Sequence, residues 1–223
     1  SSAASDVYKR QVLTTRPGIM DMAPYVPGAS KIEGVDPIIK LSSNEGALGP
    51  SPMAVEAYKE ISGDLHRYPD GASVELRAAI GARHGLDTDR IVCSAGSDEV
   101  LGLLAKAYAG PRDEVLFGEH AFVMYQLFAL AVGAVPVKAP ETDFTLSVDG
   151  LLDKVTDKTR IVYDAKPNNP TGTMVTQHEM KRLRRGLRLR PHLLVLLYVR
   201  LHLRLRAPPR LRVRRGPRVY SYD

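Results

Sequence analysis

Apolar and polar positions along the middle of the chain follow two different spacings. Apolar residues recur three or four positions apart, as in helices, at 51–61, 73–85, 98–109, 122–132 and 147–155, and again from 176. Short apolar runs rich in β-branched residues lie between them, at 90–94, 114–117, 134–137 and 160–165. This alternation predicts an α/β fold with a mostly parallel sheet and helices on both faces.

Two loops of the expected sheet contain unusual residues. "SAGSDE" (94–99) connects the strand expected at 90–94 to a helix, and "AKPNNPTGT" (165–173) follows the strand expected at 160–165. Ligands of open parallel sheets bind beyond the carboxyl ends of the strands. Both loops are therefore candidates for one ligand site at the same edge of the sheet.

The first loop is typical of a helix start that binds an anion. Gly96 permits close backbone approach, and the amides of Ser97 and Asp98 would open the helix, where the macrodipole favours negative charge. The Ser97 hydroxyl adds a further donor. An ordinary helix cap with acidic residues in its first turn explains the same letters. No G-x-x-x-x-G-K-[ST] motif is present, so a nucleotide P-loop is not supported.

The second loop is stiff. Pro167 and Pro170 fix their own φ angles and favour extended geometry at Lys166 and Asn169. An asparagine amide held in this way can donate to a ligand oxygen, although a rigid turn alone would also use these residues. Taken together, the two loops favour a phosphorylated ligand.

Four segments, in order along the chain, resemble the pyridoxal-phosphate aminotransferases of fold type I, and most closely the histidinol-phosphate branch. They are "LSSNEGALGPSP" (41–52), "HRYPDGASVELRAAIG" (66–81), "AGSDEVLGLLAKAY" (95–108) and "AKPNNPTGT" (165–173). The resemblance implies the fold type I architecture, pyridoxal 5'-phosphate as cofactor, and transfer of an amino group between an amino-alcohol phosphate and glutamate/2-oxoglutarate.

The resemblance also implies cofactor-binding roles for individual residues. Gly96, Ser97 and Asp98 match the phosphate cradle of the family. Phe122 matches the aromatic residue that stacks on the cofactor ring, and Asn169 matches the asparagine that bonds the ring oxygen.

Three further residues match positions outside this cradle. Tyr68 resembles the tyrosine that reaches the cofactor phosphate of the partner subunit, which implies a homodimer. Asn44 and Glu45 resemble the arm at the substrate entrance, where the family usually reads Asn-Glu-Asn and this chain has Gly46.

The residues that the family uses for proton transfer are not found. Its Schiff-base lysine follows the "NNPTG" loop, so Lys166 does not correspond to it, and no lysine follows Lys181. No acidic residue occurs in 192–203, where the family places the aspartate that pairs with the pyridine nitrogen. Asp164 also departs from the family, which has an apolar residue there. We expect the chain as written to be catalytically incompetent.

The charge of +6 divides unevenly along the chain. Residues 1–180 contain 17 Lys and Arg against 24 Asp and Glu, whereas 181–223 contain 14 against 1. Eleven of the 43 residues in 181–223 are Leu. A shifted reading frame of GC-rich codons would give this Arg- and Leu-rich tail, which we expect to be irregular. A solvated basic extension and a nucleic-acid-binding arm are the other interpretations.

These observations divide the chain into four parts. We interpret 1–11 as an adapter or cloning artefact, 12–60 as an N-terminal arm and the start of a small domain, 61–182 as part of the cofactor-binding domain, and 183–223 as a frameshift product. The single cysteine fits a reducing cytoplasm. No apolar run is long enough to span a membrane, and no histidine pair has metal-ligand spacing.

The sequence therefore predicts an aminotransferase of the histidinol-phosphate type, present as its N-terminal half, with no metal, no membrane and no nucleic-acid partner. Another fold type I enzyme, either an aromatic aminotransferase or one similar to threonine-phosphate decarboxylase, is the alternative. A nucleic-acid-binding protein that uses the tail is a remote third.

Overall fold

The structure, a computed structural model, describes residues 14–25, 33–34, 43–46, 48–188 and 196–197. Its contacts divide the chain into two compact units. We name Ala23–Cys93 the helical unit, and Ser1–Met22 together with Ser94–Asp223 the sheet unit. This division differs from the expected domain boundaries after residues 11, 60 and 182, which stay predictions.

Among its described residues, the helical unit contains two helices with clear local end signals. The helix α2 spans Pro52–Ile61 and α3 spans Val74–His84, and the short 3-10 turns are η1 (Ser62–Asp64) and η2 (Thr88–Arg90). Pro52 occupies the first helical position, where its missing N–H is not needed. Gly85 ends α3 in the left-handed conformation, with φ of 66°. Both helices agree with the apolar spacing of the sequence.

The part of the sheet unit that the structure describes is built on four parallel strands in the order β2-β1-β5-β6. These strands are β1 (Glu114–Gly118), β2 (Val135–Ala139), β5 (Thr159–Tyr163) and β6 (Leu196–Leu197). The predicted parallel α/β sheet is confirmed, and three of its strands lie where the apolar runs placed them. The strand expected over 90–94 does not form: no strand is assigned there in the described chain, so Ile91 is extended without a ladder partner.

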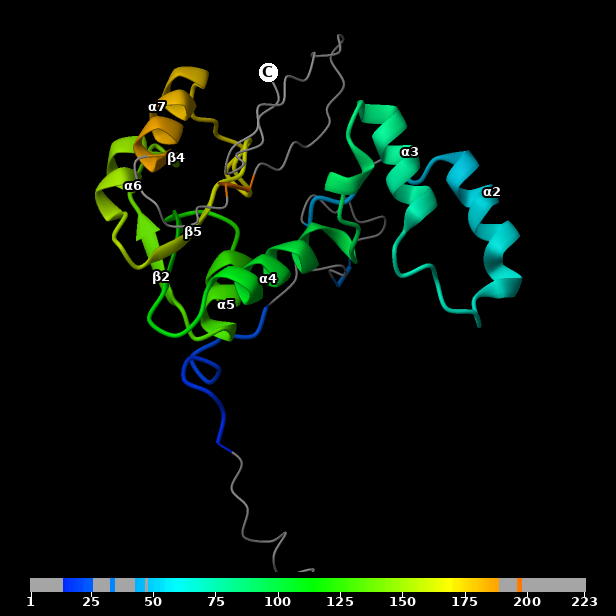
Figure 1. Cartoon of the computed structure of the whole chain (residues 1–223), viewed down its shortest axis with the longest axis horizontal. Coiled ribbons are helices and arrows are strands. Elements are labelled where there is room, and N and C mark those ends of the chain that lie inside the picture. Colours follow the sequence, from blue (N-terminus) through cyan, green and yellow to red (C-terminus); the bar gives the residue numbers. More distant parts are fainter. Residues whose placement is uncertain (1–13, 26–32, 35–42, 47, 189–195, 198–223) are drawn as a thin grey trace, which may run out of the picture. The chain divides into compact units, whose positions relative to one another are not determined.

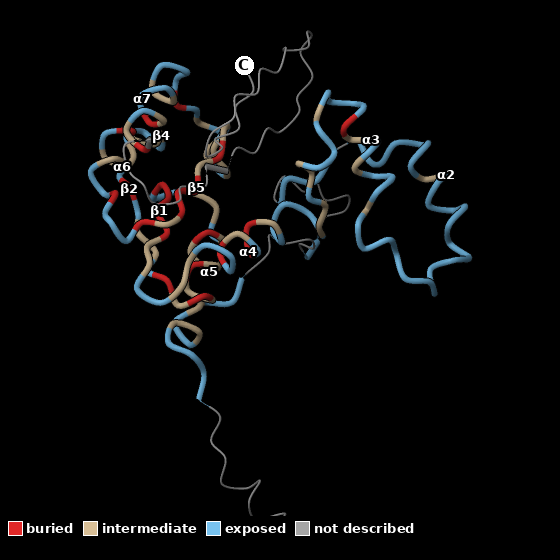
Figure 2. Tube along the Cα trace, viewed as in Figure 1, coloured by how far each residue is buried: buried red, intermediate tan, exposed pale blue. Residues whose placement is uncertain are grey.

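Helices cover both faces of this sheet (Figure 1). The helices are α4 (Gly96–Tyr108), α5 (Met124–Ala131), α6 (Val148–Lys154) and α7 (Gln177–Arg188). Because side chains alternate along a strand, Val115 and Phe117 pack on the face of α4 and α5, whereas Leu116 packs on the face of α6 and α7. Buried residues are concentrated in this unit (Figure 2).

The helix α7 continues past the predicted start of the tail. Leu183 and Leu187 lie four positions apart on one helix face, and both are buried in the core. Gly186 lies so close to α6 that an added Cβ would come within 2.6 Å of a methyl carbon of Leu152. Residues 183–188 therefore belong to the packed sheet unit. Most of 189–223 lies outside the described residues.

The edge strand β2 contains a proline that costs the sheet no hydrogen bond. The amide of Val135 donates to the carbonyl of Asp113, at 2.8 Å, on the β1 side. Neighbouring residues of a strand alternate in direction, so the nitrogen of Pro136 is directed to the outer margin.

A small antiparallel hairpin was not predicted from the sequence. It pairs β3 (Glu141–Thr142) with β4 (Thr145–Leu146). Strands of two residues are too short to show a periodic apolar pattern.

Candidate functional site

The ring of Phe122 lies just beyond the carboxyl end of β1. Gly118 ends that strand, and the carbonyl of Phe122 accepts a hydrogen bond of 3.0 Å from the amide of Tyr125 at the start of α5. The half-buried Phe122 ring meets the Tyr125 ring edge-on, with centroids 5.8 Å apart and an angle of 89° between the ring planes. Phe122 is therefore held by an aromatic support rather than by the backbone alone.

Tyr125 in turn stacks on Tyr163, the last residue of β5. Their ring centroids are 4.7 Å apart and the rings are inclined by only 16°. Burial, with a smaller contribution from the Asp164 charge, raises the pKa of Tyr125 to about 12. Burial also raises the pKa of Tyr163, so both hydroxyls are neutral near neutral pH.

The start of α4 lies at the same end of the sheet. The Tyr163 hydroxyl donates to the carbonyl of Leu101, in the second turn of α4, at 2.8 Å. With a rise of about 1.5 Å per residue, the first turn of α4 lies within about 8 Å of this bond along the helix axis. One buried hydrogen bond therefore fixes the N-terminal half of α4 to the carboxyl end of β5.

The first turn of α4 contains the three predicted cradle residues, and all three are exposed. Gly96 has φ of 78°, which favours glycine, and no atom lies within 4 Å of the place where a Cβ would stand. Partial burial raises the pKa of Asp98. The carboxylate of Glu99 accepts from the amide of Ala95 at 2.7 Å, which is the helix-cap role that the sequence also allowed.

The turn that contains Asn169 is closed by its own hydrogen bonds. The amide of Asn168 donates to the carbonyl of Thr173, and the amide of Gly172 donates back to the carbonyl of Asn168, both at 2.9 Å. The peptide bonds before Pro167 and Pro170 are cis. The side-chain amide of Asn168 donates to the carbonyl of His120 at 3.3 Å, which joins this turn to the loop that contains Phe122.

Asp164 follows β5 directly and is the most perturbed carboxyl group of the site. Burial raises the pKa of Asp164 to about 6, and the positive charge of Lys166 opposes this rise. Asp164 also lies close enough to Tyr125 to raise the pKa of that hydroxyl. The cost expected for a carboxylate in place of an apolar residue therefore appears as a pKa raised toward neutral pH.

Three loops thus gather at one rim of the sheet. They are the start of α4, the loop after β1 and the turn after β5, and they contain Gly96–Asp98, Phe122 and Asn169. The sequence missed the residues that connect them. Tyr125, Tyr163, His120 and Asn168 were not singled out, although Tyr125 follows Phe122 at helical spacing.

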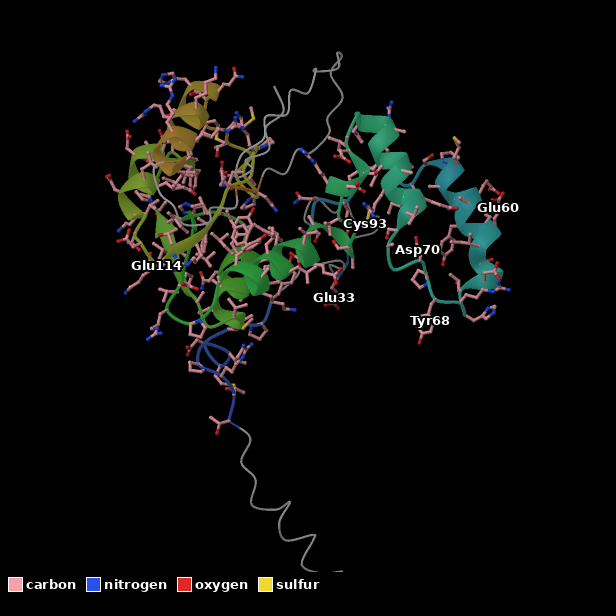
Figure 3. The ribbon with its side chains drawn as sticks, viewed as in Figure 1. Glu33, Glu60, Tyr68, Asp70, Cys93 and Glu114 are labelled. Atoms are coloured by element: carbon pink, nitrogen blue, oxygen red, sulfur yellow. The ribbon has the colours of Figure 1, made fainter. Side chains whose placement is uncertain are left out.

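The other predicted site residues lie in the helical unit. Tyr68 is fully exposed, and in Figure 3 its ring projects away from the ribbon of that unit. Asn44 and Glu45 are exposed as well, and Asn44 has φ of 53°, a value that asparagine tolerates better than most residues. The roles of all three at a partner's cofactor or a substrate entrance stay predictions.

The described residues contain neither a metal-binding cluster nor a membrane-spanning helix. No group of three or more His, Cys, Asp or Glu side chains there could hold a metal ion. No helix in the same part of the chain is long and apolar enough to cross a membrane.

Comparison with known proteins identifies relatives of high similarity. The histidinol-phosphate aminotransferase of Paramagnetospirillum magneticum is 62% identical over 173 residues, which are 78% of this chain and 48% of that protein. The enzyme of the same name from Rhodospirillum rubrum is 56% identical over 173 residues, with 78% and 47% covered. The chain spans about half the length of the curated relatives it matches.

Solved structures agree in fold. The chain superimposes on histidinol-phosphate aminotransferase from Sinorhizobium meliloti in complex with pyridoxal-5'-phosphate with a TM-score of 0.63 and 25% identity, over 69% of this chain and 42% of that one. The aromatic aminotransferase of Pyrococcus horikoshii gives a TM-score of 0.58 at 25% identity, over 68% and 44%.

The family profile gives the membership directly. The profile for aminotransferase class I and II matches residues 36–196, which include parts of both units and all three loops of the rim. The chain therefore belongs to the class I and II aminotransferases.

Proposed function

We propose that this chain is the N-terminal half of a pyridoxal-phosphate-dependent aminotransferase of the histidinol-phosphate type. The observation that carries the proposal is the 62% identity over 173 residues to one histidinol-phosphate aminotransferase. The intact enzyme would move an amino group between an amino-alcohol phosphate and glutamate/2-oxoglutarate. It would act as a homodimer in the cytoplasm.

The residues at the rim fit the cofactor. The open first turn of α4, with Gly96 at φ of 78° and space around it, suits a phosphate group, because helix N-termini favour anions. The half-buried ring of Phe122 offers an apolar face to a flat heterocycle. The side-chain amide of Asn169 would donate to the oxygen of that ring, and Tyr68 would contact the phosphate held by the partner subunit.

The residues present account for binding and orientation only. The start of α4, with the Ser97 hydroxyl, would anchor the phosphate, Phe122 would exclude water from one face of the ring, and Asn169 would fix its rotation. The bound cofactor supplies an electron sink for the substrate. The residues that would move the proton are not in this sequence, which has no lysine after Lys181. We therefore expect no transamination by the 223-residue chain.

The experiment that tests the function is to re-read the DNA that encodes the Arg- and Leu-rich tail. The expected result is that another frame restores an acidic residue and then a Ser-Lys segment. The restored enzyme should then aminate 2-oxoglutarate with histidinol phosphate as donor, at a kcat/KM well above that with phenylalanine or threonine phosphate.

Other outcomes would lead to other assignments. A preference for phenylalanine or threonine phosphate would replace this specificity with that of another fold type I enzyme. If no frame restores a lysine, and the chain binds DNA in a salt-dependent way that deletion of 183–223 abolishes, the basic tail would be functional and the proposal wrong.

A further inference from the structure

The β3–β4 hairpin lies against the loop that contains Phe122. The side chain of Glu141, at the start of the hairpin, is only 2% exposed. One of its carboxylate oxygens accepts from the backbone amide of His120 at 3.0 Å. The other lies 3.0 Å from Nδ1 of the same residue, so the tautomer with its proton on Nδ1 donates a second bond. His120 stands two positions before Phe122.

The far end of the same hairpin contacts the turn that contains Asn169. The hydroxyl of Thr173 donates to the carbonyl of Phe144 at 2.6 Å. The Phe144 ring meets the His120 ring edge-on at 5.0 Å. A further hydrogen bond, from the side-chain amide of Asn168 to the carbonyl of His120, connects this turn directly to the loop that contains Phe122.

Thr171 adds hydrogen bonds within the turn that connect Asn168 to Thr173. Its hydroxyl accepts from the side-chain amide of Asn168 at 2.8 Å and lies 2.8 Å from the Thr173 hydroxyl. The loop after β1, the hairpin and the turn after β5 are therefore connected by a continuous series of hydrogen bonds, and Glu141 provides two of them.

The backbone leaves room for the Glu141 carboxylate. A Cβ added to Gly118, at the end of β1, would stand 2.4 Å from Oε1 of Glu141. A buried carboxylate is costly unless donors surround it. Here the donors are the backbone nitrogen and the ring Nδ1 of His120. The absence of a side chain at Gly118 allows the carboxylate to reach them.

We propose that Glu141 is a positioning residue that acts through His120 to hold Phe122 and Asn169 in a fixed relative arrangement. The proposal rests on the proposed function, in which those two residues contact the same cofactor ring. Because the hairpin bonds to both loops, it fixes their spacing more firmly than the single Asn168–His120 bond would. Loss of Glu141 should therefore loosen a turn that Glu141 does not itself touch.

Amide hydrogen exchange followed by NMR on the full 223-residue chain tests this inference. In Glu141→Ala, the amides of His120, Asn168 and Gly172 should exchange about tenfold faster, the effect of losing about 1.4 kcal/mol of hydrogen bonding. The amides of Leu116 and Val162, in the middle of β1 and β5, should not change. The matched control is Asp143→Asn, which removes a charge from an exposed position of the same hairpin and should change none of these rates.

Two substitutions at other residues separate positioning from a general structural role. In His120→Ala the same amides should exchange faster, whereas His120→Asn keeps a donor near the place of Nδ1 and should restore slow exchange at Asn168 and Gly172. Gly118→Ala should reproduce Glu141→Ala, because the new methyl group displaces the carboxylate. Faster exchange at His120 with no change at Asn168 and Gly172 would overturn the proposal, as would faster exchange throughout the sheet.

A ligand titration separates this inference from the proposed function. Pyridoxal phosphate and inorganic phosphate are each added to the wild-type chain and to Glu141→Ala, and binding is followed by phosphorus NMR. The variant should bind pyridoxal phosphate about tenfold more weakly and inorganic phosphate equally well, since only the ring contacts are loosened. Equal loss for both ligands would overturn the positioning role. Absence of binding to the wild-type chain would count against the proposed cofactor, while the exchange rates would still decide whether Glu141 couples the two loops.

Discussion

The two compact units differ sharply in burial (Figure 2). In the sheet unit, Leu116 of β1 and Leu183 of α7 are both completely buried. In the helical unit, α2 buries no residue and α3 buries only Gly81. Apolar side chains of α3 such as Leu76 are about half exposed, at 53%. One unit has a core within the described residues, and the other consists of helices without one.

This difference shows which interactions maintain each unit. The helices of the helical unit depend on local bonds, such as those from the amides of Ala72 and Val74 to the carboxylate of Asp70, at 2.9 and 2.8 Å. Those bonds lower the pKa of Asp70. Isolated helices of ten or eleven residues are marginal in water. The sheet unit depends instead on contacts between residues far apart in the sequence, so its stability should respond to single core substitutions.

The largest expected effect is that of Leu116→Ala in β1. Leu116 is completely buried against α6 and α7, so its truncation removes apolar contacts and leaves a cavity. We expect a loss of about 3 kcal/mol in the free energy of unfolding. Urea unfolding followed by near-ultraviolet circular dichroism of the Tyr125–Tyr163 stack measures it. A loss below 1 kcal/mol would mean that the sheet unit is not closely packed.

Asp164→Asn should have the next largest effect, and it should depend on pH. The pKa of Asp164 rises from 3.8 to about 6 on folding, so the folded state holds a proton that the unfolded state releases. The stability of the wild-type chain therefore falls as pH rises through this window. The variant should be more stable by about 2 kcal/mol near pH 7 and equal to wild type near pH 4. An equal difference at both pH values would contradict the assigned pKa.

A smaller effect is expected for Tyr163→Phe. The change removes the hydroxyl that donates to the Leu101 carbonyl and keeps the ring that stacks on Tyr125. Stability should fall by about 1 kcal/mol. The amides in the second turn of α4 should exchange faster, as seen by NMR, while those of β5 stay protected. Unchanged exchange in α4 would show that this hydrogen bond does not hold the helix start.

The smallest effect is expected for Leu76→Ala, the same chemical change as Leu116→Ala but in the helical unit. Its side chain is about half exposed, so the free energy of unfolding should change by less than about 0.5 kcal/mol. Thermal unfolding of both variants under one set of conditions makes the comparison. A loss as large as that of Leu116→Ala would mean that α3 is buried in solution and that the contrast between the units is wrong.

The elements with long apolar patterns could be predicted from the sequence, and those that depend on a partner could not. The apolar spacing at 147–155 predicted α6, because Val148 and Leu151 repeat at helical spacing and both are buried. The run at 90–94 has the composition of a strand, but a strand needs a neighbour, and the described sheet offers none there. The hairpin at 141–146 has too few residues to show a period.

The sequence indicated individual residues of the candidate site but not the contacts that join its loops. Gly96 and Asn169 were singled out because helix starts and proline-rich turns have recognisable residue patterns, and their roles stay predictions. Glu141 and His120 lie 21 positions apart, and nothing in their local sequence indicates that they meet. Their pairing follows from the register of β1 with β2, which brings Gly118 opposite Ala139, two residues before Glu141.

Pro136 affects which margin of the sheet can pair with a further strand. Its nitrogen has no hydrogen to offer on the outer margin of β2, and the exposed Lys138 adds a charge two residues further along. A second copy of the chain that paired with this margin would lack the hydrogen bond that the N–H of another residue at position 136 would donate. It would also have to desolvate the ammonium group of Lys138. The β2 side is thus protected from edge-to-edge association, and additional strands would have to join at the opposite margin, beside β6.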